Sequence, residues 1–353
     1  MAEPDSEVVT ITCTELDDTI DRYRSQGFQL DALGPADDPT WAELSNGRSL
    51  ILLQAGTGPA LDRRGLHIPE ATPELSVEHE SGDGWVTGRA GMRYRDLVPG
   101  RYGGAYIASH IHIPDGGPVA DYVHHHDIAY QLIFCHRGWV RVVYQDQGPS
   151  FVMNPGDCVL QPPGIRHQVL EASDDLFVVE VSCPAEHRTN VDHELTLPTA
   201  AIDVERRFGG QRFVRHEGAT MGWEQSGYAM FDEQRTAIAD ATDGLAAVRL
   251  LRSHGHLATE PLATEPLATE PLATEPLATE PLPLDHEHDF LLLFVLRGSL
   301  GLQCPDGSTI SLAEGSSVAV PPSPSATTGA GYALAEIAPD TELLEVSSSV
   351  APS

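Results

Sequence analysis

Two short stretches decide how this chain folds: YVHHHDIAYQ at residues 122–131 and GDCVLQPPGIRH at residues 156–167. Side chains on a β-strand alternate between its two faces, so His124 and His126 share one face. The Pro-Pro-Gly run before His167 ends a second strand in a turn, which would bring this histidine back toward the first pair. Imidazole nitrogen is a good ligand for zinc, iron, copper and nickel. The two stretches therefore predict a metal site made of three histidines.

Both stretches resemble the motifs of the cupin superfamily, whose members are small antiparallel β-barrels with a metal held inside. The first cupin motif reads His-x-His, three or four residues, Glu, six residues and Gly. Here Gly138 completes the motif, and Gln131 stands where Glu is expected. The second motif reads Gly, five residues, Pro-x-Gly, two residues and His, and residues 156–167 match it fully. The resemblance implies a cupin barrel in which His124, His126 and His167 bind a divalent metal.

A second copy of the pattern follows later in the chain. The segment FLLLFVLRG at residues 290–298 parallels YQLIFCHRG at residues 130–138. In the second copy, however, Ala326 falls at the place of the last histidine, and His286 and His288 lie about two residues too close to the following glycine. We therefore expect a second barrel that binds no metal.

The N-terminal region predicts a small α/β unit. A strand-like run covers residues 8–12, an amphipathic helix covers residues 16–26, and a turn at Asn46 and Gly47 joins two strands into a hairpin. This order resembles one module of the glyoxalase-like fold. Since no His or Glu pair suits a metal there, we expect a structural or oligomerising unit.

The expected fold is mainly β, with two cupin barrels of the double-stranded β-helix type and a small N-terminal α/β glyoxalase-like unit. The expected order is the α/β unit at 1–60, a connector at 61–100, barrel 1 with the metal site at 101–190, a linker at 191–235 and a degenerate barrel 2 at 236–348. A LATEP repeat interrupts barrel 2 at residues 257–281. Its regular prolines forbid a continuous helix or a central strand, so we expect an extended surface loop.

Composition excludes several classes of function. The formal net charge of −31 argues against nucleic acid or an anionic membrane as partner. All 21 basic residues are arginines, which excludes lysine Schiff-base and P-loop chemistry. The five scattered cysteines indicate reduced thiols. With an acidic N-terminus and no long apolar stretch, we expect a soluble cytoplasmic protein.

Several other residues are candidates for the site. A second His-x-His pair, His110 and His112, lacks the glycine spacing of the cupin motif, so we expect it to support the ligands from behind or to line the pocket rather than to bind the metal. Aromatic and amide side chains near the motifs are candidate pocket walls or core residues: Tyr130, Trp139 and Gln161. We interpret the two remaining histidines of this region as solvent-facing or as hydrogen-bonded structural residues: His125 and His136.

Three neutral histidines leave several coordination positions of a divalent ion open, with room for O2 and a substrate that has adjacent oxygens. Among two-barrel cupins, this arrangement is similar to the gentisate and salicylate dioxygenases. The resemblance implies an Fe(II) dioxygenase that acts on a small oxygenated or aromatic acid or a phenol. In this interpretation Gln131 donates a hydrogen bond near the open face, and Arg166 either faces solvent or pairs with a substrate carboxylate.

Two other functions stay open. A non-redox isomerase, lyase or hydrolase would use Zn, Mn or Ni as a Lewis acid. A barrel that binds a small molecule without turnover is the third hypothesis. The resemblance to two-barrel cupins also implies a homodimer.

Overall fold

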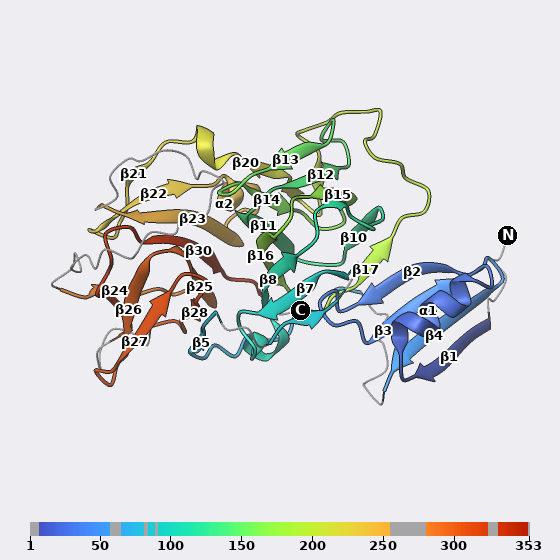
Figure 1. The fold of residues 1–353 in the computed structure, drawn as a ribbon, viewed down its shortest axis with the longest axis horizontal. Helices are drawn as coiled ribbons and strands as arrows, with labels where there is room; N and C mark the ends of the chain where they lie inside the picture. Colours follow the sequence, from blue (N-terminus) through green and yellow to red (C-terminus); the bar gives the residue numbers. More distant parts are fainter. Residues whose placement is uncertain are drawn as a thin grey trace.

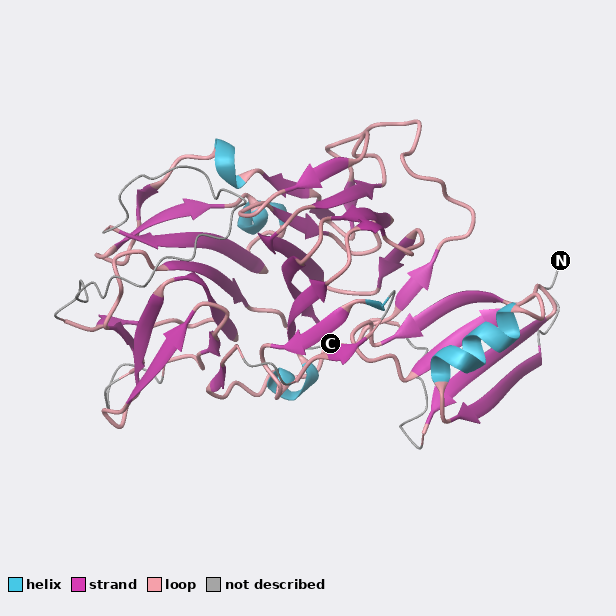
Figure 2. Cartoon of the chain, in the orientation of Figure 1, coloured by secondary structure: helices cyan, strands magenta, loops and turns pink. Residues whose placement is uncertain are grey.

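Strands dominate the chain, as the sequence predicts (Figure 1, Figure 2). The computed structural model describes residues 7–56, 65–80, 84–88, 91–254, 280–323 and 331–351. Residues 257–279 of the LATEP repeat and Ala326 therefore lie outside the described residues. Among the helices that are described, none is long and apolar enough to cross a membrane.

The N-terminal unit consists of a four-stranded sheet with one helix. Its elements are β1 (Glu7–Cys13), α1 (Leu16–Arg24), β2 (Gln29–Gly34), β3 (Trp41–Ser45) and β4 (Ser49–Ala55). Leu16 and Ile20 of the helix are buried in the core of this unit. The hairpin prediction is confirmed, because β3 pairs with β4 and the Asn46 side-chain oxygen accepts hydrogen bonds from the backbone N–H groups of Arg48 and Ser49.

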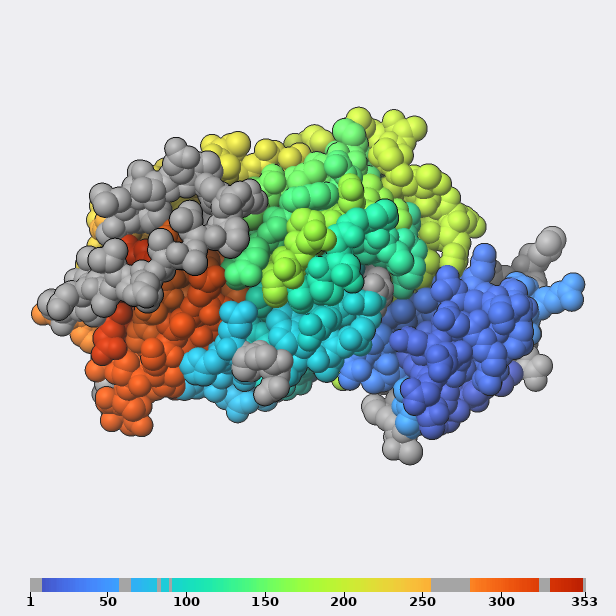
Figure 3. Space-filling view, in the orientation of Figure 1, coloured from blue at the N-terminus to red at the C-terminus, as the bar shows by residue number. Residues whose placement is uncertain are grey.

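This sheet continues directly into barrel 1. β2 pairs with β17 (Thr189–Val191), and β17 pairs with β10 (His124–His126). The sheet then runs through β15 (His167–Ala172), β12 (Val140–Tyr144) and β13 (Phe151–Met153), and β9 (Gly117–Pro118) also pairs with β15. Figure 3 shows the N-terminal unit in blue as a lobe beside barrel 1. The unit is thus an extension of the sheet that carries the predicted ligands.

A second sheet closes barrel 1. It contains β20 (Val214–His216), β14 (Cys158–Gln161), β11 (Tyr130–Arg137), β16 (Leu176–Cys183), β8 (Ile107–Ile113), β7 (Arg93–Asp96) and β6 (Val86–Thr87), in that order. Aliphatic side chains from both sheets fill the interior, including Ile133, Val142 and Val178. A short hairpin of β18 (Arg207–Phe208) and β19 (Gln211–Arg212) precedes β20.

Barrel 2 repeats this plan. Its larger sheet has the order β21 (Glu224–Gln225), β22 (Phe231–Arg235), β23 (Ala246–Ser253), β30 (Glu342–Ser348), β25 (Phe290–Arg297), β28 (Ser317–Ala319) and β5 (Ser76–Glu78). Its smaller sheet has the order β24 (Leu282–Pro283), β29 (Ala333–Ala335), β26 (Ser299–Gln303) and β27 (Thr309–Ala313). The short helix α2 (Ile238–Ala241) leads into β23. The predicted mainly β fold with two barrels is confirmed.

Segments outside the expected barrel ranges add strands to both barrels. β5 comes from the range expected as a connector and pairs with β28 of barrel 2. From the range expected as a linker, β20 pairs with β14 of barrel 1, whereas β22 pairs with β23 of barrel 2. Both segments therefore contribute strands to the sheets.

The internal repeat is visible in the backbone. β11 and β25 each have eight residues, and their pairing with the neighbouring strand becomes irregular at the same place, between Cys135 and Arg137 and between Val295 and Arg297. The glycine that follows, Gly138 or Gly298, has φ +76 in both copies. This left-handed conformation favours glycine, which explains why the repeat keeps it.

Alternate residues of β11 and β25 pack together between the barrels. Tyr130, Leu132 and Phe134 belong to one buried cluster with Phe290, Leu292 and Phe294. The Tyr106 ring stacks on the Phe290 ring, with the centroids 4.6 Å apart. The side chains between them on β11 face the interior of barrel 1. β11 therefore contributes side chains to two hydrophobic cores.

We expect Phe290→Ala to destabilise the protein by about 3–5 kcal/mol, because it removes a fully buried ring from the core between the barrels. Chemical unfolding followed by circular dichroism would measure the change. As a control, Ile202→Ala removes a side chain that is 63% exposed and should have little effect. A loss below about 1 kcal/mol for Phe290→Ala would contradict a shared core.

Candidate metal centre

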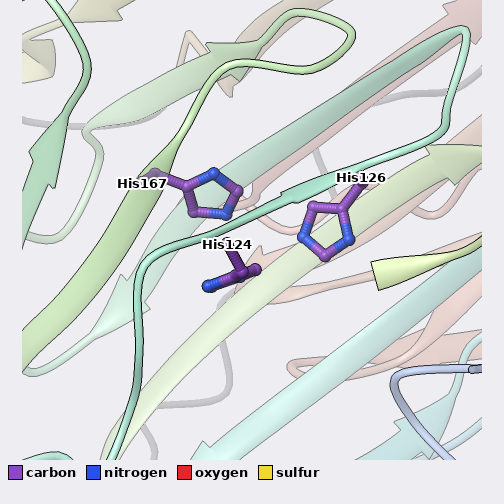
Figure 4. A group of neighbouring side chains, drawn as sticks. All are labelled: His124, His126 and His167. Carbon is purple, nitrogen blue, oxygen red and sulfur yellow. The ribbon is translucent and has the colours of Figure 1, made fainter. Parts of the chain in front are cut away.

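The three predicted histidines meet in barrel 1 (Figure 4). His124 lies directly opposite His167 in the pairing of β10 with β15, and the two ring centroids are 4.2 Å apart. The His126 ring is 5.1 Å from the first and 5.2 Å from the second. All three side chains are buried, and their ligand atoms lie within 4.8 Å of one another. No other group of this kind occurs among the described residues.

Hydrogen bonds orient the rings. The Nδ1 atom of His124 lies 2.8 Å from the carbonyl oxygen of Tyr122, and that of His167 lies 3.0 Å from the carbonyl oxygen of Ile165. A carbonyl oxygen can only accept, so Nδ1 carries the proton and Nε2 carries the lone pair in both rings. A metal-bound histidine needs this arrangement.

The ring of His126 is positioned by residues on and just before the neighbouring strand β17. Nδ1 of His126 lies 3.0 Å from the hydroxyl oxygen of Thr189 on β17. The ring of His187 packs edge-on against the His126 ring, 5.3 Å away. His187 itself is buried, and this burial lowers its pKa, so it is neutral at pH 7. β17 and the segment before it therefore position the third candidate ligand.

The donor set fits a divalent metal. Metal–nitrogen bonds of about 2.1 Å place two ligand atoms of one ion about 3–4 Å apart. The observed limit of 4.8 Å is close to this range. Neutral imidazoles suit zinc, iron, copper and nickel. The three histidines could therefore hold a divalent metal ion.

A carboxylate that the motif analysis missed lies behind the histidines. The side chain of Asp121 is completely buried, with Oδ1 3.6 Å from Nδ1 of His124. Its Oδ2 accepts a hydrogen bond of 2.9 Å from the backbone N–H of Val169 on β15. A buried negative charge beside a ligand histidine raises the basicity of the ring. The sequence signal was an acid three residues before the first histidine, which has no fixed place in the motif.

The histidines line a cavity of about 70 Å³ in the interior of barrel 1. Most of the wall is aliphatic, with Met92, Ile111, Ile113, Ile133, Val140, Val142, Met153, Val169, Leu176 and Val178. The polar part of the wall consists of the histidines, two tyrosines, two glutamines and one glutamate. The cavity therefore suits a small, largely apolar ligand.

The two glutamines are cross-strand neighbours. Gln131 on β11 lies directly opposite Gln161 on β14. The amide nitrogen of Gln161 donates a hydrogen bond of 2.8 Å to the hydroxyl of Tyr144. The Tyr144 ring in turn stacks at 24° to the His167 ring, with the centroids 5.6 Å apart. Gln131, Gln161 and Tyr144 thus form one layer beside the histidines.

Other sequence candidates lie elsewhere. Arg166 donates hydrogen bonds of 3.0 Å to the carboxylate of Asp192 and to the carbonyl oxygen of Gly164, and it does not line the cavity. Its contact with a substrate stays a prediction. Tyr130 lies in the core between the barrels, and Trp139 is also absent from the cavity wall.

The second pair, His110 and His112, lies apart from the three candidate ligands. We expected this pair to line the cavity, but neither histidine is part of the cavity wall. His110 lies between the barrels, where its Nε2 is 3.2 Å from Nδ1 of His136 and its Nδ1 is 3.3 Å from the guanidinium of Arg95. Burial lowers the pKa of His136 to about 4, and it also lowers the pKa of His110. His112 stacks on Phe177 at 4.2 Å. These rings have structural contacts of their own.

The chain resembles a known family over part of its length and several solved structures at low sequence identity. Residues 117–186 match the AraC-like ligand binding domain family. No curated protein matches the chain. Similar solved structures include a salicylate 1,2-dioxygenase from Pseudaminobacter salicylatoxidans, with TM-score 0.49, 14% identity and coverage of 81% of this chain and 87% of that chain. An oxalate decarboxylase from Lactobacillus farciminis has TM-score 0.47 and 11% identity, with coverage of 84% and 89%. Protein Ylba from E. coli has TM-score 0.47 and 9% identity, with coverage of 81% and 94%.

We expect Asp121→Asn to weaken metal binding by about 10- to 100-fold, because it removes the buried negative charge behind His124. Titration of the metal-free protein with Zn(II) and a competing chelator would measure the affinity. Asp115→Asn removes an exposed acid from the same region and serves as the matched control. Equal affinities for the two variants would contradict a role for Asp121.

Proposed function

We propose that this chain is a metal-dependent cupin oxidoreductase, an Fe(II) dioxygenase that acts on a small oxygenated or aromatic acid or a phenol. The observation that carries the proposal is the group of three buried histidines on the wall of a cavity. His124, His126 and His167 would hold the ion. When bound, Fe(II) would supply the redox chemistry that allows O2 to react with an organic molecule.

The ligand set supports this choice over a site with a carboxylate ligand. Gln131 stands where the cupin motif has Glu, and it lines the cavity beside the histidines. A neutral amide leaves the positive charge of a metal uncompensated by its ligands. Such a site attracts an oxygen-bearing substrate and leaves coordination positions open.

The remaining walls of the cavity have two roles. The aliphatic side chains from both sheets exclude water, which strengthens every polar interaction inside. The layer formed by Gln131, Gln161 and Tyr144 orients a bound molecule against the histidines. A carboxylate substrate would gain Arg166 as a partner only if its pairing with Asp192 opened.

A second candidate function is the binding of a small molecule without turnover. The match to the AraC-like ligand binding domain favours it, because residues 117–186 include all three histidines. A non-redox enzyme with Zn, Mn or Ni as a Lewis acid would use the same ligands. Metal identity and oxygen dependence distinguish these functions.

The first test is metal content by mass spectrometry. We expect about one equivalent of iron in the wild type, and loss of it in the double variant His124→Ala/His167→Ala, because two of three ligands disappear. The double variant His193→Ala/His254→Ala removes two partly exposed histidines outside the site and should keep the metal. Circular dichroism would verify that each variant is folded.

Oxygen uptake with a panel of hydroxylated aromatic compounds is the second step. Uptake that requires both iron and the intact histidines would support the dioxygenase. One equivalent of Zn, Mn or Ni without oxygen uptake would overturn it in favour of the non-redox enzyme. Ligand that co-purifies without turnover, in a protein that retains no metal, would favour the binding barrel. The expected homodimer stays a prediction.

A further inference from the structure

We propose that Gln131 and Gln161 form a pair of hydrogen-bond acceptors that selects an uncharged phenol with adjacent hydroxyl groups over an aromatic carboxylate. The proposal rests on the proposed function of the neighbouring histidines and narrows its substrate class. Its basis is the chemistry of the cavity wall, residue by residue.

Gln131 and Gln161 both line the cavity, and each has a buried amide oxygen without a hydrogen-bond partner in the described part of the chain. Gln131 is 1% exposed and Gln161 is 5% exposed. The Oε1 atom of each has no hydrogen-bond partner among the described residues. A buried carbonyl oxygen without a donor destabilises the fold. Two such atoms on directly opposite residues indicate that a bound molecule supplies the donors.

One of the two amides is hydrogen-bonded through its nitrogen. The nitrogen of Gln161 donates to the hydroxyl of Tyr144, which leaves its oxygen to accept. Tyr144 cannot turn away freely, because it is fully buried and stacks on His167. In this arrangement the wall has an acceptor beside the proposed ligands without a donor among the described residues. A hydroxyl group donates to such an acceptor, whereas an ionised carboxylate has no proton to donate.

The absence of positively charged side chains from the described cavity wall also favours a phenol over a carboxylate. No arginine lines the cavity in the described part of the chain, and the sequence contains no lysine. Glu180 on β16 is a lining residue and adds a carboxyl group. With the amides oriented as observed, a ligand carboxylate would thus meet two carbonyl oxygens and no arginine. Since burying a charge without a partner is costly, the site disfavours aromatic carboxylates.

The second barrel supplies the variants that test the proposal. At the positions that correspond to the two glutamines it has Leu291 and Val320, which are buried in its own core. The backbone N–H of Val320 donates to the carbonyl oxygen of Leu291, so these residues are also cross-strand neighbours. The same fold thus accepts apolar residues there. Gln131→Leu and Gln161→Val should therefore fold.

Calorimetric titration of the Zn(II)-loaded protein would measure binding without turnover. The probes form two matched pairs, catechol with salicylate and phenol with benzoate, in which a hydroxyl replaces a carboxylate. We expect each phenol to bind at least about tenfold more tightly than its carboxylate partner. Gln131→Leu and Gln161→Val should each weaken catechol binding by about tenfold without a change in zinc content. Gln225→Leu changes an exposed glutamine and should have no effect.

The same titrations with metal-free protein separate this proposal from the proposed function. If the carboxylates bind more tightly, or if both glutamine variants keep wild-type affinity for catechol, the selectivity proposal is overturned while the metal site stands. If the protein retains no metal but prefers phenols through the two glutamines, the selectivity stands and the dioxygenase proposal falls. Absence of binding to all four probes in both forms would overturn the selectivity proposal as well.

Discussion

The site depends on one register, the antiparallel pairing that places His124 opposite His167. A slip by one residue would turn the histidines out of the barrel, because side chains alternate along a strand. β10 has only three residues, so its position depends on its neighbours β15 and β17. β17 is continued by β2 of the N-terminal unit, so this unit forms one sheet with the strands that carry the three histidines.

β11 connects the site to the rest of the molecule. One face of the strand packs against barrel 2 through Tyr130, Leu132 and Phe134, and the other face carries Gln131 into the cavity. Barrel 2 has the same strand and the same turn glycine but an apolar interior. It therefore supports barrel 1 by packing.

The two glutamines of the cavity are buried where aliphatic residues would pack as well. Barrel 2 shows this directly, with leucine and valine in place of the two glutamines. The carboxylate side chain of Asp121, which lies behind His124, is also completely buried. Buried polar groups that destabilise the fold are typical of functional sites, where a ligand or a metal satisfies them.

Sequence alone determined the two barrels, the hairpin and the three histidines, because turn residues, period-two alternation and motif spacing are local properties of the chain. It could not place Asp121, Glu180 or Arg166 relative to the cavity, since their surroundings come from strands distant in sequence. Tertiary structure also decided that β5 joins barrel 2, that β20 joins barrel 1 and that β2 continues the sheet of β17. Pairing of sheet edges depends on which edges meet in space, and no local pattern encodes that choice.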